Sequence, residues 1–278
     1  MSELSPSADL VRRHDHDRFL TGLFAPAACR DDLYALYAFN LEIARIREVV
    51  SEPIVGQIRL QWWRDTIDDL FSGRASDHEI AAALGRAIER HGLAREPFDG
   101  LIEAREFDLD DQPPKTMAAL KQYAEQSSSN LTLLALAILG HCTGAAYLAG
   151  RHVGLAWALT GLLRAVPFHA AQSRLYLPAD LVAAADVAAE DVFAGQAGTA
   201  LRPVLAAVAD EARAHLGHAR DQKGVARAAL AALLPATQAD DYLRRMAKTD
   251  YDLNSLPATT GRVRRMASLW WHARRGRF

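Results

Sequence analysis

The stretch from Leu33 to Glu48, LYALYAFNLEIARIRE, constrains the fold more than any other part of the chain. It contains no Gly or Pro and is rich in Leu and Ala, which are strong helix formers. Its apolar residues recur at the spacing of one helical face. Asn40, Ala44 and Glu48 lie four residues apart, so they stack on one face that continues the apolar stripe. The sequence therefore predicts a helix whose inner face lines either a cavity or a tight helix crossing.

The rest of the chain also has helical patterns. No alternating run is bounded by hairpin dipeptides, so strands have little support. Nothing in the 278 residues marks a boundary between two domains. We therefore predict an all-α, single-domain protein, with residues 1–16 as a flexible N-terminus and residues 17–278 as the folded domain. The predicted helices cover residues 17–24, 28–50, 53–73, 77–91, 97–108, 117–139, 152–169, 200–219, 223–234, 238–248 and 262–275.

Composition limits the classes of function. The formal net charge of −2 argues against a nucleic-acid partner. No apolar run approaches the roughly 18–20 residues that span a bilayer, and the first 17 residues lack the apolar core of a signal peptide. Cys29 and Cys142 lie far apart without the spacing of metal ligands, which fits a reducing compartment. We therefore expect a cytoplasmic protein.

Two stretches resemble a known family. The run ALYAF before Ala44, and the stretch Leu159 to Pro178, LTGLLRAVPFHAAQSRLYLP, are similar to the two aspartate-rich segments of the squalene/phytoene synthase family. This resemblance implies an isoprenoid synthase-type helical bundle around a central cavity. It also implies head-to-head prenyl transfer, with carboxylates that hold Mg²⁺ on the diphosphate of the substrate. Weaker matches extend the resemblance to Arg30, Trp63, Asp108 and Tyr123.

The metal-binding positions of both motifs have been lost. Mg²⁺ is held by carboxylates and substrate phosphates in near-octahedral geometry, whereas Arg47 adds positive charge beside the first motif, and Pro167 is expected to kink the second helix. We therefore expect no catalytic residues, no bound metal and no cofactor, with Mg²⁺ needed only if the protein is an enzyme after all. The six positions that correspond to the metal-binding acids of the family, of which only Glu48 is still acidic, are Ala44, Arg45, Glu48, Ala165, Phe168 and His169.

A ligand-binding cavity remains a hypothesis for the retained polar residues. Asn40, Glu48 and His169 are equally consistent with polar residues satisfied inside a filled core. Arg164 and Arg174 are equally consistent with a structural ion-pair network or with binding of a diphosphate or phospholipid head group. The candidate cavity residues are Asn40, Glu48, Trp63, Arg164, His169, Arg174 and Tyr176.

Other charged clusters are expected to have no function. Glu211, His215 and His218 share one helical face and could bind a transition metal. No partner helix with matching ligands is evident from the sequence, so a surface helix is the favoured interpretation. The run from His14 to Asp17 falls in the terminus predicted to be flexible. Solvated faces or helix ends, rather than relocated metal sites, are expected for Asp65, Asp68, Asp69, Glu106, Asp108, Asp110 and Asp111.

The C-terminal segment from Gly261 to Phe278 holds six arginines and no acid. A basic helix that carries tryptophans suits an anionic membrane surface or a docking groove. The alternative is a terminal helix whose tryptophans pack on the core. We favour core packing for Trp270 and a surface role for the arginines. The candidate membrane or partner surface consists of Arg264, Arg265, Trp270, Trp271, Arg274 and Arg275.

Within the family, the stretch AFNLEIARIREVVSEPIVGQIRLQWW resembles the degenerate branch that contains assembly factors of respiratory NADH dehydrogenase (complex I). This resemblance implies a non-catalytic protein on the cytoplasmic face of the inner membrane, or on the matrix side in an organelle. Candidate partners are a membrane-arm subunit or another assembly factor, a lipid or isoprenoid ligand, and the anionic membrane. The alternatives are an active phytoene or squalene synthase that uses prenyl diphosphates and Mg²⁺, and a lipid or isoprenoid carrier.

Overall fold

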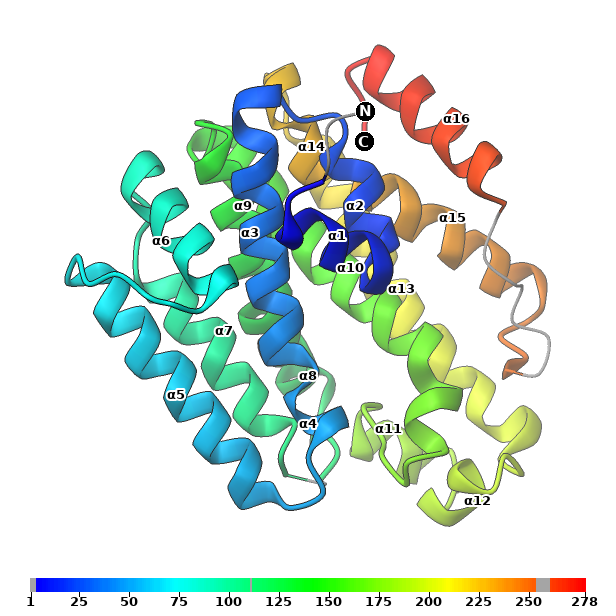
Figure 1. Ribbon diagram of the computed structural model, residues 1–278. Coiled ribbons are helices and arrows are strands. Elements are labelled where there is room, and N and C mark those ends of the chain that lie inside the picture. Colours follow the sequence, from blue (N-terminus) through cyan, green and yellow to red (C-terminus); the bar gives the residue numbers. More distant parts are fainter. Residues whose placement is uncertain (1–3, 111, 254–260) are drawn as a thin grey trace.

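The fold is organised around two central helices, α3 (Ala27–Ala44) and α10 (Gly144–Ala170) (Figure 1). The computed structural model describes residues 4–110, 112–253 and 261–278, and every regular element in these ranges is helical. The other elements are α1 (Pro6–His14), α2 (His16–Gly22), α4 (Ile46–Val49), α5 (Pro53–Phe71), α6 (Glu79–His91), α7 (Glu96–Phe107), α8 (Met117–Ala124), the π-turn η1 (Glu125–Ser129), α9 (Asn130–Ile138), α11 (Ala179–Ala184), α12 (Ala189–Phe193), η2 (Gly198–Leu201), α13 (Arg202–Asp221), η3 (Arg227–Ala229), α14 (Leu230–Leu233), α15 (Pro235–Lys248) and α16 (Arg262–Arg274).

Helix α10 forms the core of one half of the molecule. It contacts α9 and η1 as well as α13 and α15, and Leu155, Leu159 and Leu163 are buried along it. Among the described residues it alone is long and apolar enough to span a bilayer, in contrast to our expectation of no such run. Half of its most apolar window is buried inside the protein, which is typical of a core helix. The helix continues through Pro167 to Ala170.

The predicted helix over residues 117–139 is interrupted at η1, where α10 crosses it closely. A Cβ atom on Gly154 would lie 2.4 Å from the Cα of Ser129, so only glycine fits this crossing. The hydroxyl of Ser129 donates a hydrogen bond of 2.7 Å to the carbonyl of Arg151. The crossing draws Ser127 and Ser128 of η1 toward the interior, where both are buried.

The predicted helix over residues 28–50 ends early, at Ala44. Arg45 takes φ −88° and ψ −4°, and the short helix α4 starts at the next residue. This turn brings Ile46 and Val50 into the core, where they are 4% and 8% exposed. Burial of these two side chains stabilises the break.

The N-terminus differs from our expectation, because residues 6–14 form a helix rather than a flexible segment. Ser5 caps α1 by accepting a hydrogen bond of 3.3 Å from the backbone amide of Ala8, and Pro6 occupies the first turn. Val11 is fully buried, in a helix that contacts α3. Burial of the apolar face of α1 holds the helix in place.

Candidate functional site

A cavity of about 270 Å³ lies where the two degenerate motifs meet. Asn40 and Ala44 face it from α3, and Glu48 faces it from α4. Gly161, Ala165 and His169 are four residues apart on α10 and therefore form one stripe along the opposite wall. The segment after α10 adds Gln172, Arg174 and Tyr176.

The structure thus brings most of the predicted cavity residues together. Asn40, Glu48, His169, Arg174 and Tyr176 all line the cavity, as do three further degenerate positions, Ala44, Ala165 and Phe168. Arg45 is the exception in the first motif, because it lies in the turn between α3 and α4. Its Nε atom is 3.9 Å from the carboxylate of Glu48.

Two predicted cavity residues lie elsewhere. Trp63 is 3% exposed and packs edge-to-face on Phe39 at 5.1 Å between ring centroids, so it belongs to the core. Arg164 precedes the cavity-lining Ala165 by one residue, and one residue turns the direction of a helical side chain by about 100°. It therefore points toward α15, where its guanidinium stacks on Tyr242 at 3.7 Å from the ring centroid. Of the two roles that the sequence left open for Arg164, its contacts fit the structural one rather than binding of a head group.

Asp108 is the acidic residue most deeply integrated in the cavity wall. We expected it on a solvated face, but it is 6% exposed. It accepts hydrogen bonds of 2.8 Å from the hydroxyls of Tyr123 and Tyr176, and one of 3.0 Å from Arg105. Burial, and then the adjacent Asp108 carboxylate, raise the pKa of both phenols, so they stay protonated and donate.

The sequence indicated Asp108 and Tyr123 only as weak family matches. Their convergence on Tyr176 depends on how the end of α7, α8 and the segment after α10 pack together, which spacing along the chain does not reveal. Four wall residues lie on elements that sequence reasoning had not joined to the motifs: Arg18, Arg105, Ser127 and Ser128. The remaining wall residues lie within or beside the two motifs: Arg47, Trp157, Ala158, Leu162 and Gln172.

His169 is electrically neutral at physiological pH. Burial lowers the pKa of its imidazole to about 4, with Arg174 acting in the same direction and the carboxylate of Asp108 opposing both. The ring packs on Tyr176 at 4.6 Å between centroids. His169 therefore adds neither a negative charge nor a fixed positive charge to the cavity.

The donor set does not fit the magnesium clamp that the family resemblance implies. Ala44 and Ala165 offer no oxygen, Glu48 lies beside Arg45, and Asp108 is already hydrogen-bonded by three side chains. A hard dication requires several oxygen ligands that are free to coordinate it. The wall instead carries four arginines against two carboxylates, which disfavours a dication and favours an anion: Arg18, Arg47, Arg105 and Arg174 against Glu48 and Asp108.

The cavity wall also has unused hydrogen-bonding capacity. Asn40 Oδ1, Ser128 Oγ and His169 Nδ1 are buried, and none has a hydrogen-bond partner within the described chain. Buried polar atoms are nearly always paired with protein, water or ligand. The cavity is therefore suited to a polar group that both accepts and donates hydrogen bonds.

The remaining acidic residues lie mainly in surface pairs. Asp110 is exposed, and Asp111 lies outside the described residues. Pairs between acidic side chains and nearby polar or basic side chains at the surface are typical of a solvated face. The partners are Gln61 for Asp65, Arg95 for Asp68, Arg74 for Asp69 and Arg64 for Glu106.

The predicted C-terminal surface is divided by the structure. Arg265 forms an ion pair with the buried Asp17, so it belongs to the interior. Trp270 and Trp271 are 55% and 49% exposed, so the packing that we favoured for Trp270 is wrong: Leu269 is the residue that anchors α16. Arg274 stacks over Trp270 and Arg275 over Trp271, at 5.4 Å and 3.8 Å from the ring centroids.

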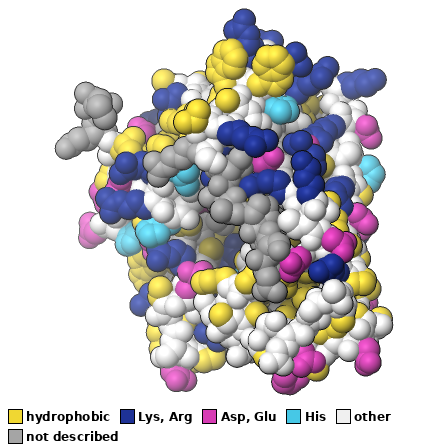
Figure 2. All heavy atoms as spheres, turned by 90° about the vertical axis from the view of Figure 1, so that its right-hand side faces the viewer, with side chains coloured by type: hydrophobic (Ala, Val, Ile, Leu, Met, Phe, Trp, Pro, Cys, Tyr) yellow, Lys and Arg dark blue, Asp and Glu magenta, His cyan; other side chains and the backbone are white. Residues whose placement is uncertain are grey.

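Basic and aromatic side chains gather at the upper end of the face shown in Figure 2, where α16 lies. Arg264 is exposed on the same helix. We define the α16 surface as Arg264, Trp270, Trp271, Arg274 and Arg275.

A second exposed apolar surface lies beside the first motif. Ile54, Ile58 and Trp62 recur every four residues on α5 and are 59%, 63% and 43% exposed. The predicted helix over residues 53–73 includes these positions, but the outward direction of their side chains was not predicted. We define the α5 stripe as Val49, Ile54, Val55, Ile58 and Trp62.

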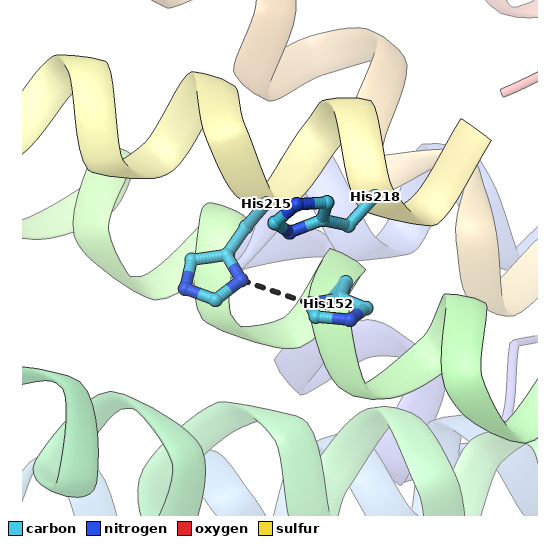
Figure 3. A group of neighbouring side chains, drawn as sticks. All are labelled: His152, His215 and His218. Atoms are coloured by element: carbon cyan, nitrogen blue, oxygen red, sulfur yellow. Dashed lines mark hydrogen bonds between the residues drawn. The ribbon is translucent and has the colours of Figure 1, made fainter. Parts of the chain in front are cut away.

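The histidine pair of α13 has a partner that the sequence did not show. His152 of α10 lies against His215 and His218 (Figure 3). Glu211 pairs with Lys121 and also lies 3.5 Å from Nε2 of His215. The surface-helix interpretation of this face is therefore wrong, because α10 packs directly against it.

Comparison with known proteins agrees with the helical fold described above. A profile of squalene/phytoene synthases matches residues 11–270. The chain belongs to the squalene/phytoene synthase family. Its fold is that of isoprenoid synthases: a dehydrosqualene synthase superposes with a TM-score of 0.81 at 17% identity, covering 95% of this chain and 93% of that one. A squalene synthase from Alicyclobacillus acidocaldarius gives 0.79 at 22% identity, covering 88% and 93%. The prediction of an all-α isoprenoid synthase fold is confirmed.

Similarity in sequence is higher to a different group within the squalene/phytoene synthase family. The Bos taurus protein named NADH dehydrogenase (ubiquinone) complex I, assembly factor 6 is 35% identical over 246 residues, which cover 88% of this chain and 74% of that protein. The Homo sapiens protein of the same name is 32% identical over the same coverage. The chloroplastic phytoene synthase 1 of Arabidopsis thaliana is 28% identical over 84% of this chain and 58% of its own length. The resemblance to the assembly-factor branch is confirmed at the level of sequence.

Proposed function

We propose that this protein is a non-catalytic member of the squalene/phytoene synthase family that acts in the assembly of respiratory NADH dehydrogenase. It works at the cytoplasmic face of the inner membrane, or at the matrix face in an organelle, and contacts a membrane-arm subunit or another assembly factor. The names of its relatives supply the process. The chemistry of the cavity supplies the argument against catalysis.

One observation carries the proposal: the cavity lies between the two family motifs, and of their metal-binding acids only Glu48 remains in its wall. Ionisation of a prenyl diphosphate requires positive charge that stabilises the leaving group, and Mg²⁺ held by carboxylates provides it in catalysis of this kind. Here the metal-ligand positions on α3 and α10 are occupied by Ala44 and Ala165, which both line the cavity. The arginines of the wall can bind a diphosphate, but the two facing pairs of acids that would hold the metal are missing.

The same cavity supports retention of a ligand. Four arginines and three unpaired buried polar atoms suit an anionic head group, such as a diphosphate or the phosphate of a phospholipid. Phe168 is 51% exposed at the wall and offers an apolar surface for a chain attached to that group. In this proposal the former substrate site acts as a binding groove.

Two exposed surfaces support work beside a membrane. The α16 surface combines arginines with tryptophans, the composition of a helix that binds an anionic bilayer surface. The α5 stripe offers apolar side chains to a hydrophobic partner, as expected for a factor that handles a membrane-arm subunit.

Deletion of the gene in its own organism tests the role in assembly. We expect the amount of assembled NADH dehydrogenase to fall and the wild-type gene to restore it. Normal levels of assembled enzyme after deletion would contradict the proposal and favour a lipid carrier.

An activity assay tests the absence of catalysis. Purified protein is incubated with Mg²⁺ and farnesyl or geranylgeranyl diphosphate, with an active squalene synthase as the positive control. We expect no release of diphosphate above background. Release that the Glu48→Ala variant abolishes would show that the protein is an active prenyl transferase.

A further inference from the structure

Three imidazole rings meet between α10 and α13, away from the cavity. His152 comes from α10, and His215 and His218 come from α13 at the spacing of one helical turn (Figure 3). One ring nitrogen from each residue lies within 4.8 Å of the others. None of the three histidines lines the cavity, whose wall residue on α10 nearest in sequence to His152 is Trp157, five residues away.

The rings face one another through the atoms that bind metals. His152 Nδ1 and His215 Nδ1 are 2.8 Å apart, so one must donate its proton to the lone pair of the other. Two protonated imidazoles could not adopt this contact. Neutral imidazole is the form that coordinates a metal.

A carboxylate lies beside the second ring nitrogen of His215. Glu211 Oε1 is 3.5 Å from His215 Nε2, a buried nitrogen with no hydrogen-bond partner in the described chain. Lys121 Nζ holds the same carboxylate oxygen at 2.6 Å. Metal-bound histidines commonly direct their second nitrogen at a carboxylate, which fixes the tautomer and aims the lone pair at the metal. Here that tautomer leaves Nδ1 of His215 open toward His152.

We propose that His152, His215 and His218 bind a divalent transition-metal ion, with Zn²⁺ as the reference ion, and that this ion ties α10 to α13. Three imidazoles are a ligand set that Zn²⁺ accepts, and exposure of His218 leaves a path for the ion and for a water as fourth ligand. Bonds of about 2.1 Å in tetrahedral geometry place ligand nitrogens about 3.4 Å apart. Binding therefore moves the His152 and His215 rings apart by about half an ångström.

Local charge does not oppose a dication at this place. Arg151 and Lys121 are the cations near the cluster, and each is paired with a carboxylate, Glu125 and Glu211 respectively. The site thus differs from the cavity, where arginines outnumber the acids. It also differs in donor type, because imidazole nitrogen selects transition metals over Mg²⁺.

Zn²⁺ titration of the untagged full-length chain against a chromophoric chelator tests this proposal. We expect one equivalent of Zn²⁺ to bind at pH 7.5 and to raise the melting temperature. His218→Ala, at an exposed position that should leave folding intact, should weaken binding at least tenfold, and His152→Gln should do the same. Co²⁺ bound in place of Zn²⁺ should give the intense visible bands of a four-coordinate site, and these should disappear in both variants.

Two control variants separate this cluster from other histidines. His141→Gln removes a half-buried histidine just before α10, and His14→Gln removes an exposed one from the N-terminal His-Asp run. Both should bind Zn²⁺ like the wild type. Failure of the wild type to bind one equivalent would overturn the proposal, as would binding that survives His218→Ala and His152→Gln but is lost in His14→Gln. Neither result depends on a role in NADH dehydrogenase assembly.

Discussion

Asp17 in α2 and Arg265 in α16 form an ion pair in the interior, although 248 residues separate them in the sequence. The same carboxylate accepts hydrogen bonds from Tyr242 at 3.1 Å and from Gln238 at 3.4 Å. Asp17 is 7% exposed, so it was desolvated to make these contacts. The pair fixes the C-terminal helix to the N-terminal part of the fold.

Removal of the Asp17 charge should be strongly destabilising. We expect Asp17→Asn to lower the free energy of unfolding by about 3 kcal/mol, because breaking a buried ion pair leaves the partner charge poorly compensated. Urea unfolding followed by circular dichroism measures the change. Asp69→Asn is the matched control, since Asp69 pairs with Arg74 at the surface, and it should cost less than about 1 kcal/mol. Equal effects of the two substitutions would contradict a structural role for Asp17.

Two glycines of α10 should respond in opposite directions to the same substitution. Gly154→Ala places a Cβ atom 2.4 Å from the Cα and 2.7 Å from the amide nitrogen of Ser129, and backbone atoms cannot rotate away. We expect a loss of about 3 kcal/mol. Gly161→Ala has no atom within 4 Å of the new Cβ, so it should stabilise the helix by about 0.5–1 kcal/mol. Thermal unfolding of both variants tests the pair, and a stable Gly154→Ala protein would show that the crossing is looser than described.

The sequence predicted the fold and the position of the site better than its contents. Helical spacing and family resemblance placed Asn40, Ala44, Ala165 and His169 on facing walls, because motifs report which side of a helix is kept. The prediction that Arg164 lines the cavity was wrong, because a motif match does not say which of two adjacent residues faces inward. Local signals also did not show the turn at Arg45.

Contacts between residues far apart in the sequence could not be predicted from local sequence patterns. The bonds from Tyr123 and Tyr176 to Asp108, and the contact between His152 and His215, join residues 15, 68 and 63 positions apart. Without knowledge of which helices pack together, His152 is one histidine on an apolar helix and Asp108 is one member of an acidic cluster. Tertiary packing, not residue type, gives both their chemical environment.

Protonation of His169 should weaken the fold below neutral pH. Its folded-state pKa of about 4 lies below the ordinary value of 6.5, so the unfolded chain binds the proton more tightly. The stability is complete above about pH 6.5 and declines as pH falls toward 4, by roughly 3 kcal/mol in total. The His169→Gln variant should lose less stability than the wild type between pH 7.5 and pH 5. An imidazole NMR titration of His169 with a midpoint near 6.5 would contradict this prediction.

The α16 surface should bind anionic vesicles in a salt-dependent manner. Each basic residue near an anionic surface contributes about 1 kcal/mol. The double variant Arg274→Gln/Arg275→Gln should therefore weaken binding to phosphatidylserine-containing vesicles by about tenfold or more in a sedimentation assay. Arg12→Gln/Arg13→Gln removes the same charge from α1 and serves as the control. Equal losses in both double variants would show that net charge alone, rather than α16, drives the binding.

The α5 stripe should matter for assembly without mattering for stability. Ile54 and Ile58 are 59% and 63% exposed, so serine at both positions removes little buried surface, and each change should alter stability by no more than about 0.5 kcal/mol. If a hydrophobic partner covers the stripe, the double variant Ile54→Ser/Ile58→Ser should complement a deletion strain poorly, measured as the amount of assembled NADH dehydrogenase. Val263→Ser, at an apolar residue of α16 that is 84% exposed, controls for loss of exposed apolar surface in general. Full complementation by the double variant would place the partner contact elsewhere on the protein, whereas failure of both variants would point to α16.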